Sequence, residues 1–153
     1  MKLLPILALG LSTIAAPLFA DGHATGDASA GENVFKKCKS CHAIIADDET
    51  VIQKGGKTGP NLYGIYMRAA GAAEGFKFGN HIVAAGEAGL MWDEESFVKY
   101  VADPKKFLAE FLGDSGAKSR MSFKLKKAED SVDLWTYLVS VGPEVEDEGE
   151  ESN

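Results

Sequence analysis

The spacing of apolar residues predicts helices near both ends of the central part of the chain. A first helix is expected over residues 30–41, capped by Ser29, because apolar side chains there recur three and four positions apart. A last helix is expected over residues 128–141, with an apolar stripe on one face and a stop at Gly142-Pro143. We expect both helices to contribute to the core, because an apolar stripe must be buried against another element.

Two shorter helices are expected between them. One covers residues 94–102, where Asp93 is a suitable N-cap and Asp103-Pro104 closes the helix. The other covers residues 104–112, because Pro104 is favoured at the first position of a helix and Gly113 at its end.

Residues 43–90 lack a regular pattern. Glycines, a charged run at 47–49 and a turn at 55–60 interrupt the apolar positions, and no apolar stretch is long enough to predict a strand. A short helix around residues 61–67 is compatible with the pattern. The sequence thus predicts an all-α fold of three to five helices joined by long loops, with only a thin core.

The segment Cys38-Lys39-Ser40-Cys41-His42 has the form C-x-x-C-H, which attaches c-type haem covalently. On a helix, Cys38, Cys41 and His42 stand at i, i+3 and i+4 and share one face. The two sulfurs can then form thioethers with the haem vinyl groups, while the imidazole reaches the iron as its proximal ligand. A haem would also supply the apolar body that the thin core lacks.

Two other chemistries use the same residues. A C-x-x-C pair in an exported protein can be a thiol–disulfide redox pair, and C-x-x-C-H can be half of a zinc site. The chain has only two cysteines and three histidines, so zinc would require His81 or His23 together with carboxylates. No strand-rich βαβ pattern of the kind that carries redox C-x-x-C pairs surrounds the motif. Both readings are therefore weaker than haem attachment.

Residues 1–20 have the composition of a signal peptide, with one lysine, an apolar stretch and small Ala20 before a polar segment. The alternative is a membrane anchor, which needs about 20 unbroken apolar residues, whereas proline and glycine interrupt this stretch. Leu18 fits the small-x-small rule imperfectly, so the cleavage site is defined only to within a few residues. We expect export to the bacterial periplasm and a flexible leader over residues 21–29.

Charge is distributed unevenly along the chain. The net charge is −7, yet residues 30–141 hold 15 acidic and 15 basic side chains, whereas residues 142–153 hold six acidic and no basic ones. We expect a single haem domain over residues 30–142. Residues 143–153 are too charged and too poor in apolar groups to pack, so we interpret them as a disordered acidic tail.

Further segments accompany the C-x-x-C-H motif in a fixed order. They are Thr58-Gly59-Pro60-Asn61-Leu62-Tyr63-Gly64, Trp92 with Tyr100, Asp103-Pro104-Lys105-Lys106-Phe107, Lys118-Ser119-Arg120-Met121-Ser122-Phe123 and Leu134-Trp135-Thr136-Tyr137-Leu138. In order and spacing the chain resembles class I cytochromes c, and most nearly the bacterial cytochrome c2 or c-550 type. The likeness covers about residues 27–141. It implies a fold in which helices and long loops surround one covalently bound haem.

The resemblance implies a role for each matching residue. Met121 matches the sixth iron ligand, opposite His42, and the carbonyl of Pro60 matches the acceptor that orients this histidine. Tyr100 matches the tyrosine beside the ligand sulfur. Trp92 and Arg68 match groups that hydrogen-bond to, or neutralise, a buried haem propionate. Gly31 and Phe35 match the place where the first helix crosses the last.

The resemblance also implies a function. A haem iron with both axial positions filled transfers single electrons and leaves no open position for a substrate, so we expect a carrier and not an enzyme. The family implies shuttling from a cytochrome bc1 complex to a cytochrome c oxidase or a photosynthetic reaction centre. We expect a monomer that neither binds nucleic acid nor inserts stably into the membrane.

A few residues depart from the family pattern or match no ligand position. Phe78 stands where many relatives have a tyrosine that reaches a propionate, and Ser119 stands where a threonine is common. Met67 and Met91 are expected to pack, and His23 and His81 to lie in loops or at the surface. Basic residues at or near positions that surround the haem edge in relatives predict a docking face, namely Lys37, Lys57, Lys105, Lys106, Arg120, Lys124, Lys126 and Lys127.

Overall fold

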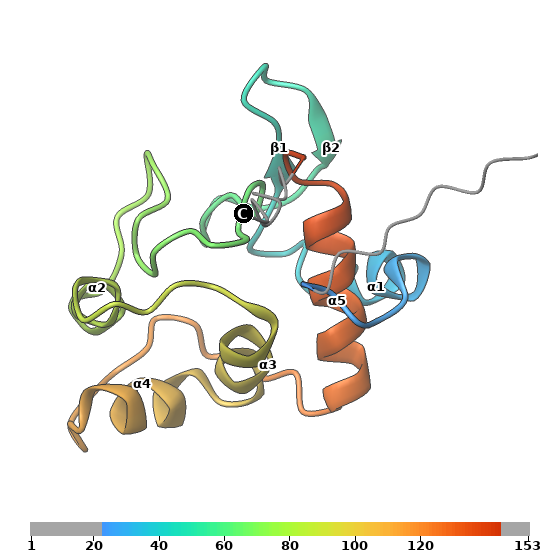
Figure 1. The fold of residues 1–153 in the computed structure, drawn as a ribbon. Coiled ribbons are helices and arrows are strands. Elements are labelled where there is room, and N and C mark those ends of the chain that lie inside the picture. The colour runs from blue at the N-terminus through green and yellow to red at the C-terminus, as the bar shows by residue number, and fades with distance from the viewer. Residues whose placement is uncertain (1–22, 145–153) are drawn as a thin grey trace, which may run out of the picture.

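The computed structural model describes residues 23–144 of the 153-residue chain (Figure 1). Its elements are α1 (Ala28–Phe35), β1 (Ile44–Ile45), β2 (Val51–Gln53), α2 (Asn80–Glu87), α3 (Glu94–Ala102), α4 (Pro104–Leu112) and α5 (Ala128–Ser140). The expected signal peptide at 1–20 lies outside the described residues, as do residues 145–153 of the expected acidic tail. Five helices within the described chain confirm the predicted all-α fold.

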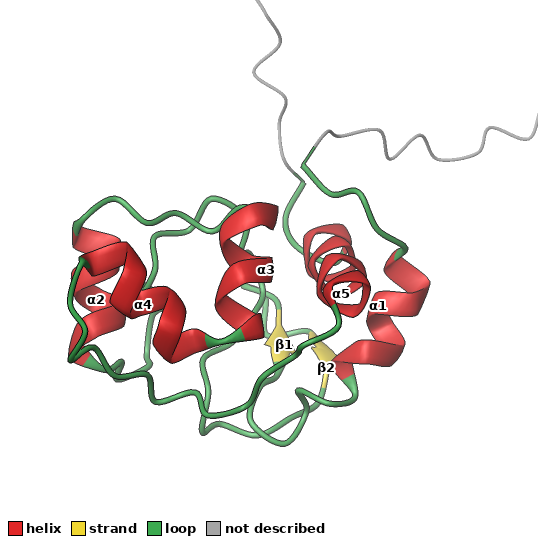
Figure 2. Ribbon diagram, turned by 90° about the horizontal axis from the view of Figure 1, so that it is seen from below, coloured by secondary structure: helices red, strands yellow, loops and turns green. Residues whose placement is uncertain are grey.

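The helices form two groups. Figure 2 shows α1 and α5 side by side, with α2, α3 and α4 on the other side of the molecule and long loops joining the groups. α3 contacts α5 across the middle, and α2 packs against α4. Within residues 23–144 no helix is both long and apolar enough to cross a membrane.

The contact between α1 and α5 depends on Gly31. A Cβ added at Gly31 would lie 1.9 Å from the backbone oxygen of Asp133 and 2.7 Å from Cβ of Tyr137. The fully buried ring of Phe35 contacts Tyr137, with centroids 6.1 Å apart. The predicted crossing of the first helix with the last is thus confirmed, and only glycine allows the backbones to come this close.

The first helix differs from its predicted bounds. It starts at Ala28, because Asp27 accepts a hydrogen bond from the backbone N–H of Ala30 and acts as the N-cap in place of Ser29. The Ser29 hydroxyl donates to the Asp27 carboxylate instead. The helix ends at Phe35, and residues 36–41 form a series of turns.

The other predicted helices are confirmed. Asp93 and Ser96 cap α3 reciprocally, and Pro104 occupies the first turn of α4. Gly113 ends α4 with φ of 63°, a left-handed conformation that favours glycine. α5 begins at Ala128 as predicted and is one residue shorter at its C-terminus.

The irregular region contains structure that the sequence analysis missed. β1 and β2 form a small antiparallel hairpin, although no strand was predicted, because two- and three-residue strands are too short to show an alternating pattern. α2 was missed because Ala85 is its only buried residue, and Gly79 gives it no side-chain cap. The short helix considered at 61–67 does not form, and that segment consists of turns and irregular chain.

The expected leader at 21–29 is attached to the domain over its described part. The backbone N–H and hydroxyl of Thr25 each donate a 2.7 Å hydrogen bond to the Glu94 carboxylate. The indole N–H of the fully buried Trp135 donates to the backbone oxygen of His23, 2.7 Å away. Residues 28 and 29 already belong to α1. Hydrogen bonds to α3 and α5 therefore hold this segment, which polarity alone marked as flexible.

Candidate functional site

A cavity of about 300 Å³ lies between the two groups of helices, lined mainly by apolar side chains. Its walls come from the turns after α1, the irregular region, α2, α3, α5 and the loop before α5. The cavity brings together all eight site residues named from the sequence, which are Cys38, Cys41, His42, Pro60, Arg68, Trp92, Tyr100 and Met121.

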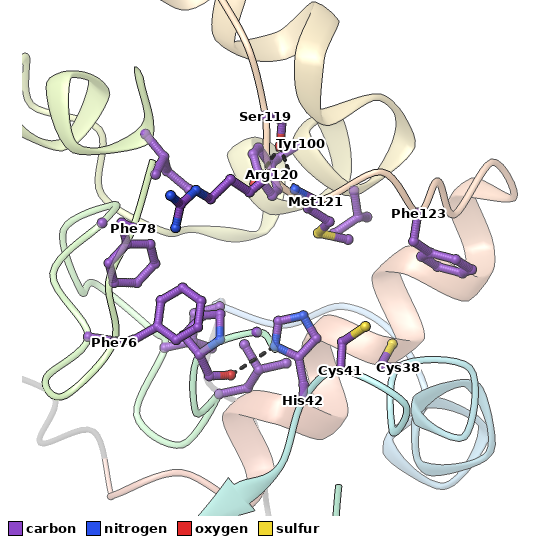
Figure 3. Close-up of a pocket in the computed structure, with 18 of the residues that line it drawn as sticks. Cys38, Cys41, His42, Phe76, Phe78, Tyr100, Ser119, Arg120, Met121 and Phe123 are labelled. Carbon is purple, nitrogen blue, oxygen red and sulfur yellow. Dashed lines mark hydrogen bonds between the residues drawn. The ribbon is translucent and has the colours of Figure 1, made fainter. Parts of the chain in front are cut away.

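His42 has a fixed ring orientation. Its Nδ1 lies 2.8 Å from the backbone carbonyl of Pro60, and a carbonyl can only accept, so Nδ1 carries the proton (Figure 3). Burial lowers the pKa of His42, although the bond to Pro60 opposes this shift. The neutral ring therefore has an unprotonated Nε2 available as a metal ligand.

Glycines allow the chain to pass close to this histidine. A Cβ at Gly59 would lie 2.3 Å from His42 Cε1, and a Cβ at Gly55 would lie 1.7 Å from the His42 backbone oxygen. The glycine-rich turn between 55 and 60 thus does more than reverse the chain. It forms a close cradle for the imidazole, in which a side chain at Gly59 would displace the ring.

Turns place the two cysteines beside His42. The N–H groups of Cys41 and His42 both donate to the Cys38 carbonyl, at 3.0 and 2.9 Å. The expected helical spacing is therefore kept locally, although the helix itself has ended. Burial raises the pKa of the Cys38 thiol to about 11, whereas hydrogen bonds from Thr58 and Ser40 lower the pKa of the exposed Cys41.

Met121 lies on the opposite wall. Figure 3 shows its sulfur pointing into the cavity, across from the His42 ring and the two cysteines beside that ring. The Met121 N–H donates a 3.1 Å hydrogen bond to Ser119 Oγ, which is also 3.5 Å from the Tyr100 hydroxyl. Tyr100 is buried, and burial raises its pKa. The loop before α5 and helix α3 therefore position this thioether together.

Arg68 and Trp92 lie on the wall formed by the irregular region. The guanidinium of Arg68 donates to the carbonyls of Tyr63 and Asn61, at 2.8 and 3.1 Å, which uses two of its five N–H donors. Burial lowers its pKa, but an arginine stays protonated. The ring of Trp92 contacts that of Tyr100, with centroids 5.0 Å apart. The wall thus supplies one positive charge among apolar groups.

The donor set matches one class of cofactor. Two thiols, an imidazole and a thioether line an apolar cavity, which suits a flat apolar macrocycle bound through sulfur and holding a soft-ligated iron. A zinc site does not fit, because residues 23–144 contain no group of three or more His, Cys, Asp or Glu side chains that could hold a metal.

The chain is similar to known proteins in both sequence and structure. Cytochrome c-551 of Roseobacter denitrificans is 52% identical over 133 residues, which cover 87% of the chain and 91% of the relative. The solved structure of cytochrome c2 from Rhodobacter sphaeroides is 49% identical and superposes with a TM-score of 0.76, covering 77% of the chain and 98% of that structure. The chain belongs to the class I cytochrome c family. Ferric cytochrome c-550 of Paracoccus versutus, at 46% identity, superposes with a TM-score of 0.74, covering 78% of the chain and all of that structure. No protein-family model matches the chain.

As a member of this family, the chain is a haem-containing electron carrier of the cytochrome c2 and c-550 type. The family implies a c-type haem, and Cys38 and Cys41 fit its covalent attachment. The resemblance found in the sequence is thus confirmed.

Phe76 and Phe78 form a pair of rings in the cavity that the sequence only partly predicted. Phe78 was noted as a departure from the family, but Phe76 was not noted at all, and the two rings meet edge to face with centroids 4.8 Å apart. Both line the cavity, as does Ile82 from the unpredicted helix α2. Two phenylalanines among glycines, without strand alternation, were the available signal, because apolar rings in a loop need a surface to cover.

Proposed function

We propose that this cytochrome is a soluble periplasmic one-electron carrier whose iron is held by His42 and Met121. The observation that carries the proposal is that these two side chains face each other across an apolar cavity, with both cysteines at one edge. A c-type haem bound there would supply an iron that alternates between the ferrous and ferric states.

The protein residues define what the iron can do. The Pro60 carbonyl holds the imidazole and increases its basicity, because it accepts the Nδ1 proton. With haem bound, the thioether of Met121 would hold the iron from the side opposite His42 and would leave no site for substrate, in keeping with a carrier and not an enzyme. A soft thioether and a low-polarity cavity both favour the ferrous state, which supports a comparatively high reduction potential.

Arg68 has a distinct role in the proposal. A haem carries propionates, and burying such charges without partners is costly. The half-buried guanidinium of Arg68 has N–H donors in addition to the two that bind backbone carbonyls. We assign Arg68 and the nearby Trp92 to a propionate, while Phe78 lacks a hydroxyl for the same task.

The proposed ligation is tested by replacing the thioether. Ferric wild-type protein should show the weak near-infrared band of sulfur–iron ligation, and its pyridine haemochrome spectrum should show covalent haem. Met121→Ala should lose the band, have a lower potential and bind carbon monoxide in the ferrous form. Met91→Ala is the matched control and should keep the band, because Met91 is 38% exposed and does not line the cavity. Loss of the band in Met91→Ala, with retention in Met121→Ala, would refute the ligand assignment.

We also propose that the carrier takes electrons from a cytochrome bc1 complex and delivers them to a cytochrome c oxidase or photosynthetic reaction centre. The basic docking face is weaker than the sequence suggested, because four of its eight cations form ion pairs. The pairs are Lys37–Asp130, Lys106–Glu110, Lys124–Asp103 and Lys127–Glu129. No ion pair of Lys105 is found among the described residues. Lys105 is therefore a better position than the four paired lysines at which to test the docking face.

Charge reversal tests the docking face. The rate of reaction with an oxidase or reaction centre should fall as ionic strength rises, because opposite charges attract. Lys105→Glu should slow association more than Lys99→Glu, which reverses a charge on α3, and should leave the reduction potential nearly unchanged. A rate that increases with salt, or equal effects of the two reversals, would contradict a basic docking face.

A further inference from the structure

Arg120 bridges two segments at the mouth of the cavity. Its Nη1 donates a 2.9 Å hydrogen bond to the backbone carbonyl of Lys77, 43 residues away along the chain. Its aliphatic stem lies near Gly79, where an added Cβ would be 3.4 Å from Arg120 Cγ. Figure 3 shows the side chain extending from the segment that carries Met121 toward Phe78. One side chain thus connects the methionine side of the cavity to the phenylalanine pair.

The segment that Arg120 reaches has few other attachments. Within residues 23–144, no other side chain hydrogen-bonds to residues 73–78, and no backbone hydrogen bond joins them to another part of the chain. Phe76 and Phe78 contact each other and the cavity. A segment with so few hydrogen bonds opens at low free-energy cost, so the bond from Arg120 is important to its placement.

The segment that carries Met121 is attached in a similar way. Within the described part of the chain, residues 118–124 form no backbone–backbone hydrogen bonds, and the Met121 N–H is held by Ser119 Oγ. Arg120 directly precedes Met121, so a movement of its backbone also moves the thioether. Breaking the bond between Arg120 and Lys77 would therefore release both segments together.

We propose that Arg120 is a positioning residue that controls how readily Met121 leaves the iron. The inference rests on the proposed function, in which Met121 is the axial ligand. Outward movement of the Met121 segment requires the bond between Arg120 and the Lys77 carbonyl to break. The intact bond therefore opposes the loss of the thioether from the iron. When the bond breaks, an external ligand can replace the thioether. A hydrogen bond with a charged donor at an exposed site should change this equilibrium about five- to tenfold.

Imidazole binding to the ferric protein tests the proposal. Arg120→Met keeps most of the aliphatic stem and removes every N–H donor. We expect its affinity for imidazole, followed as loss of the near-infrared band, to rise about five- to tenfold. The change in potential is not diagnostic, because removal of any nearby positive charge lowers it.

Two control variants separate the hydrogen bond from other effects. Lys77→Met removes a positive charge at the other end of the same bond but keeps the acceptor carbonyl, and Thr25→Ala removes a hydrogen bond to Glu94 outside the cavity. Both should bind imidazole as wild type does. An equal rise in Lys77→Met, or wild-type binding in Arg120→Met, would overturn the role of Arg120. Absence of the sulfur–iron band from wild-type protein would instead overturn the proposed ligation.

Discussion

The two sides of the cavity are built differently. The histidine wall, residues 38–42 and 55–60, is held by backbone bonds, including those from Gly56 N–H to the Lys39 carbonyl and from Gly59 N–H to the Cys41 carbonyl, both 2.9 Å. The methionine wall, residues 118–123, has no backbone–backbone hydrogen bonds within the described chain. Its contacts are made by side chains, chiefly Ser119 and Arg120.

This difference has consequences for an electron carrier. Backbone bonds in the histidine wall are independent of side-chain identity, so they fix His42 as long as the glycines are present. Bonds from side chains in the methionine wall can be changed singly, and each contributes about 1 kcal/mol. The histidine wall therefore fixes the cofactor, whereas the methionine wall allows the strength of the sixth ligand to be adjusted by substitution.

The largest effect is expected from a methyl group in the histidine wall. In Gly59→Ala the new Cβ would lie 2.3 Å from His42 Cε1, so the imidazole or the turn must move. Overpacking of this kind costs about 1–3 kcal/mol or more. We expect a marked fall in the yield of protein with covalent haem, measured by the pyridine haemochrome spectrum, and a lower unfolding midpoint in the protein that does form.

The same substitution on the other side of the cavity is the matched control. In Gly79→Ala the Cβ would lie 3.4 Å from the flexible Arg120 side chain, which is ordinary van der Waals contact. Exchange of the Gly79 N-cap for alanine should cost about 1 kcal/mol, because alanine is a poor N-cap, but it leaves the His42 ring in place. If Gly79→Ala lowered the haem yield as much as Gly59→Ala, the histidine wall would not be the more rigid one.

The sequence predicts the helices and the site residues better than it predicts the contacts of the methionine wall. Short-range rules placed α3, α4 and α5, because Asp93, Pro104 and Gly113 act on their own neighbours. The family motifs named all eight residues that meet in the cavity. The contact of Arg120 with the Lys77 carbonyl was not predictable, because any residue has a carbonyl and its position depends on an irregular loop. Prediction therefore failed at a long-range contact whose partner neither the local pattern nor the family motifs name.

An intermediate effect is expected from Ser119 in the methionine wall. Ser119→Ala removes the acceptor of the Met121 N–H and the hydroxyl that lies 3.5 Å from the Tyr100 hydroxyl. We expect a loss of about 1 kcal/mol in the free energy of unfolding, measured with urea, and tighter imidazole binding to the ferric protein. Ser119→Thr keeps the oxygen and should resemble wild type. Equal behaviour of the alanine and threonine variants would show that the oxygen does not hold Met121.

The smallest effects are expected from two exposed ion pairs, one beside each wall. Lys37, which precedes Cys38, pairs with Asp130 at 2.8 Å, and Lys124 pairs with Asp103 at 2.6 Å. The hydrogen bond from Lys37 lowers the pKa of Asp130, and that from Lys124 lowers the pKa of Asp103. The folded state therefore favours each carboxylate. This stabilisation is fully present above the unfolded-state pKa of about 3.9 and is lost as pH falls through the lower folded-state pKa.

Replacing each aspartate by asparagine should therefore flatten the fall in stability on acidification, with variant and wild type converging at low pH and under high salt. Urea unfolding of Asp130→Asn and Asp103→Asn between neutral pH and pH of about 3 measures this change. Asparagine can still cap α4 at position 103, so helix capping is not disturbed. If the walls differ as described, Asp103→Asn alone should also speed imidazole binding. The reason is that Lys124 directly follows the methionine wall, which has no backbone–backbone hydrogen bonds within the described chain. Equally fast imidazole binding in Asp130→Asn would mean that the histidine wall opens as readily as the methionine wall, which would contradict the proposed difference.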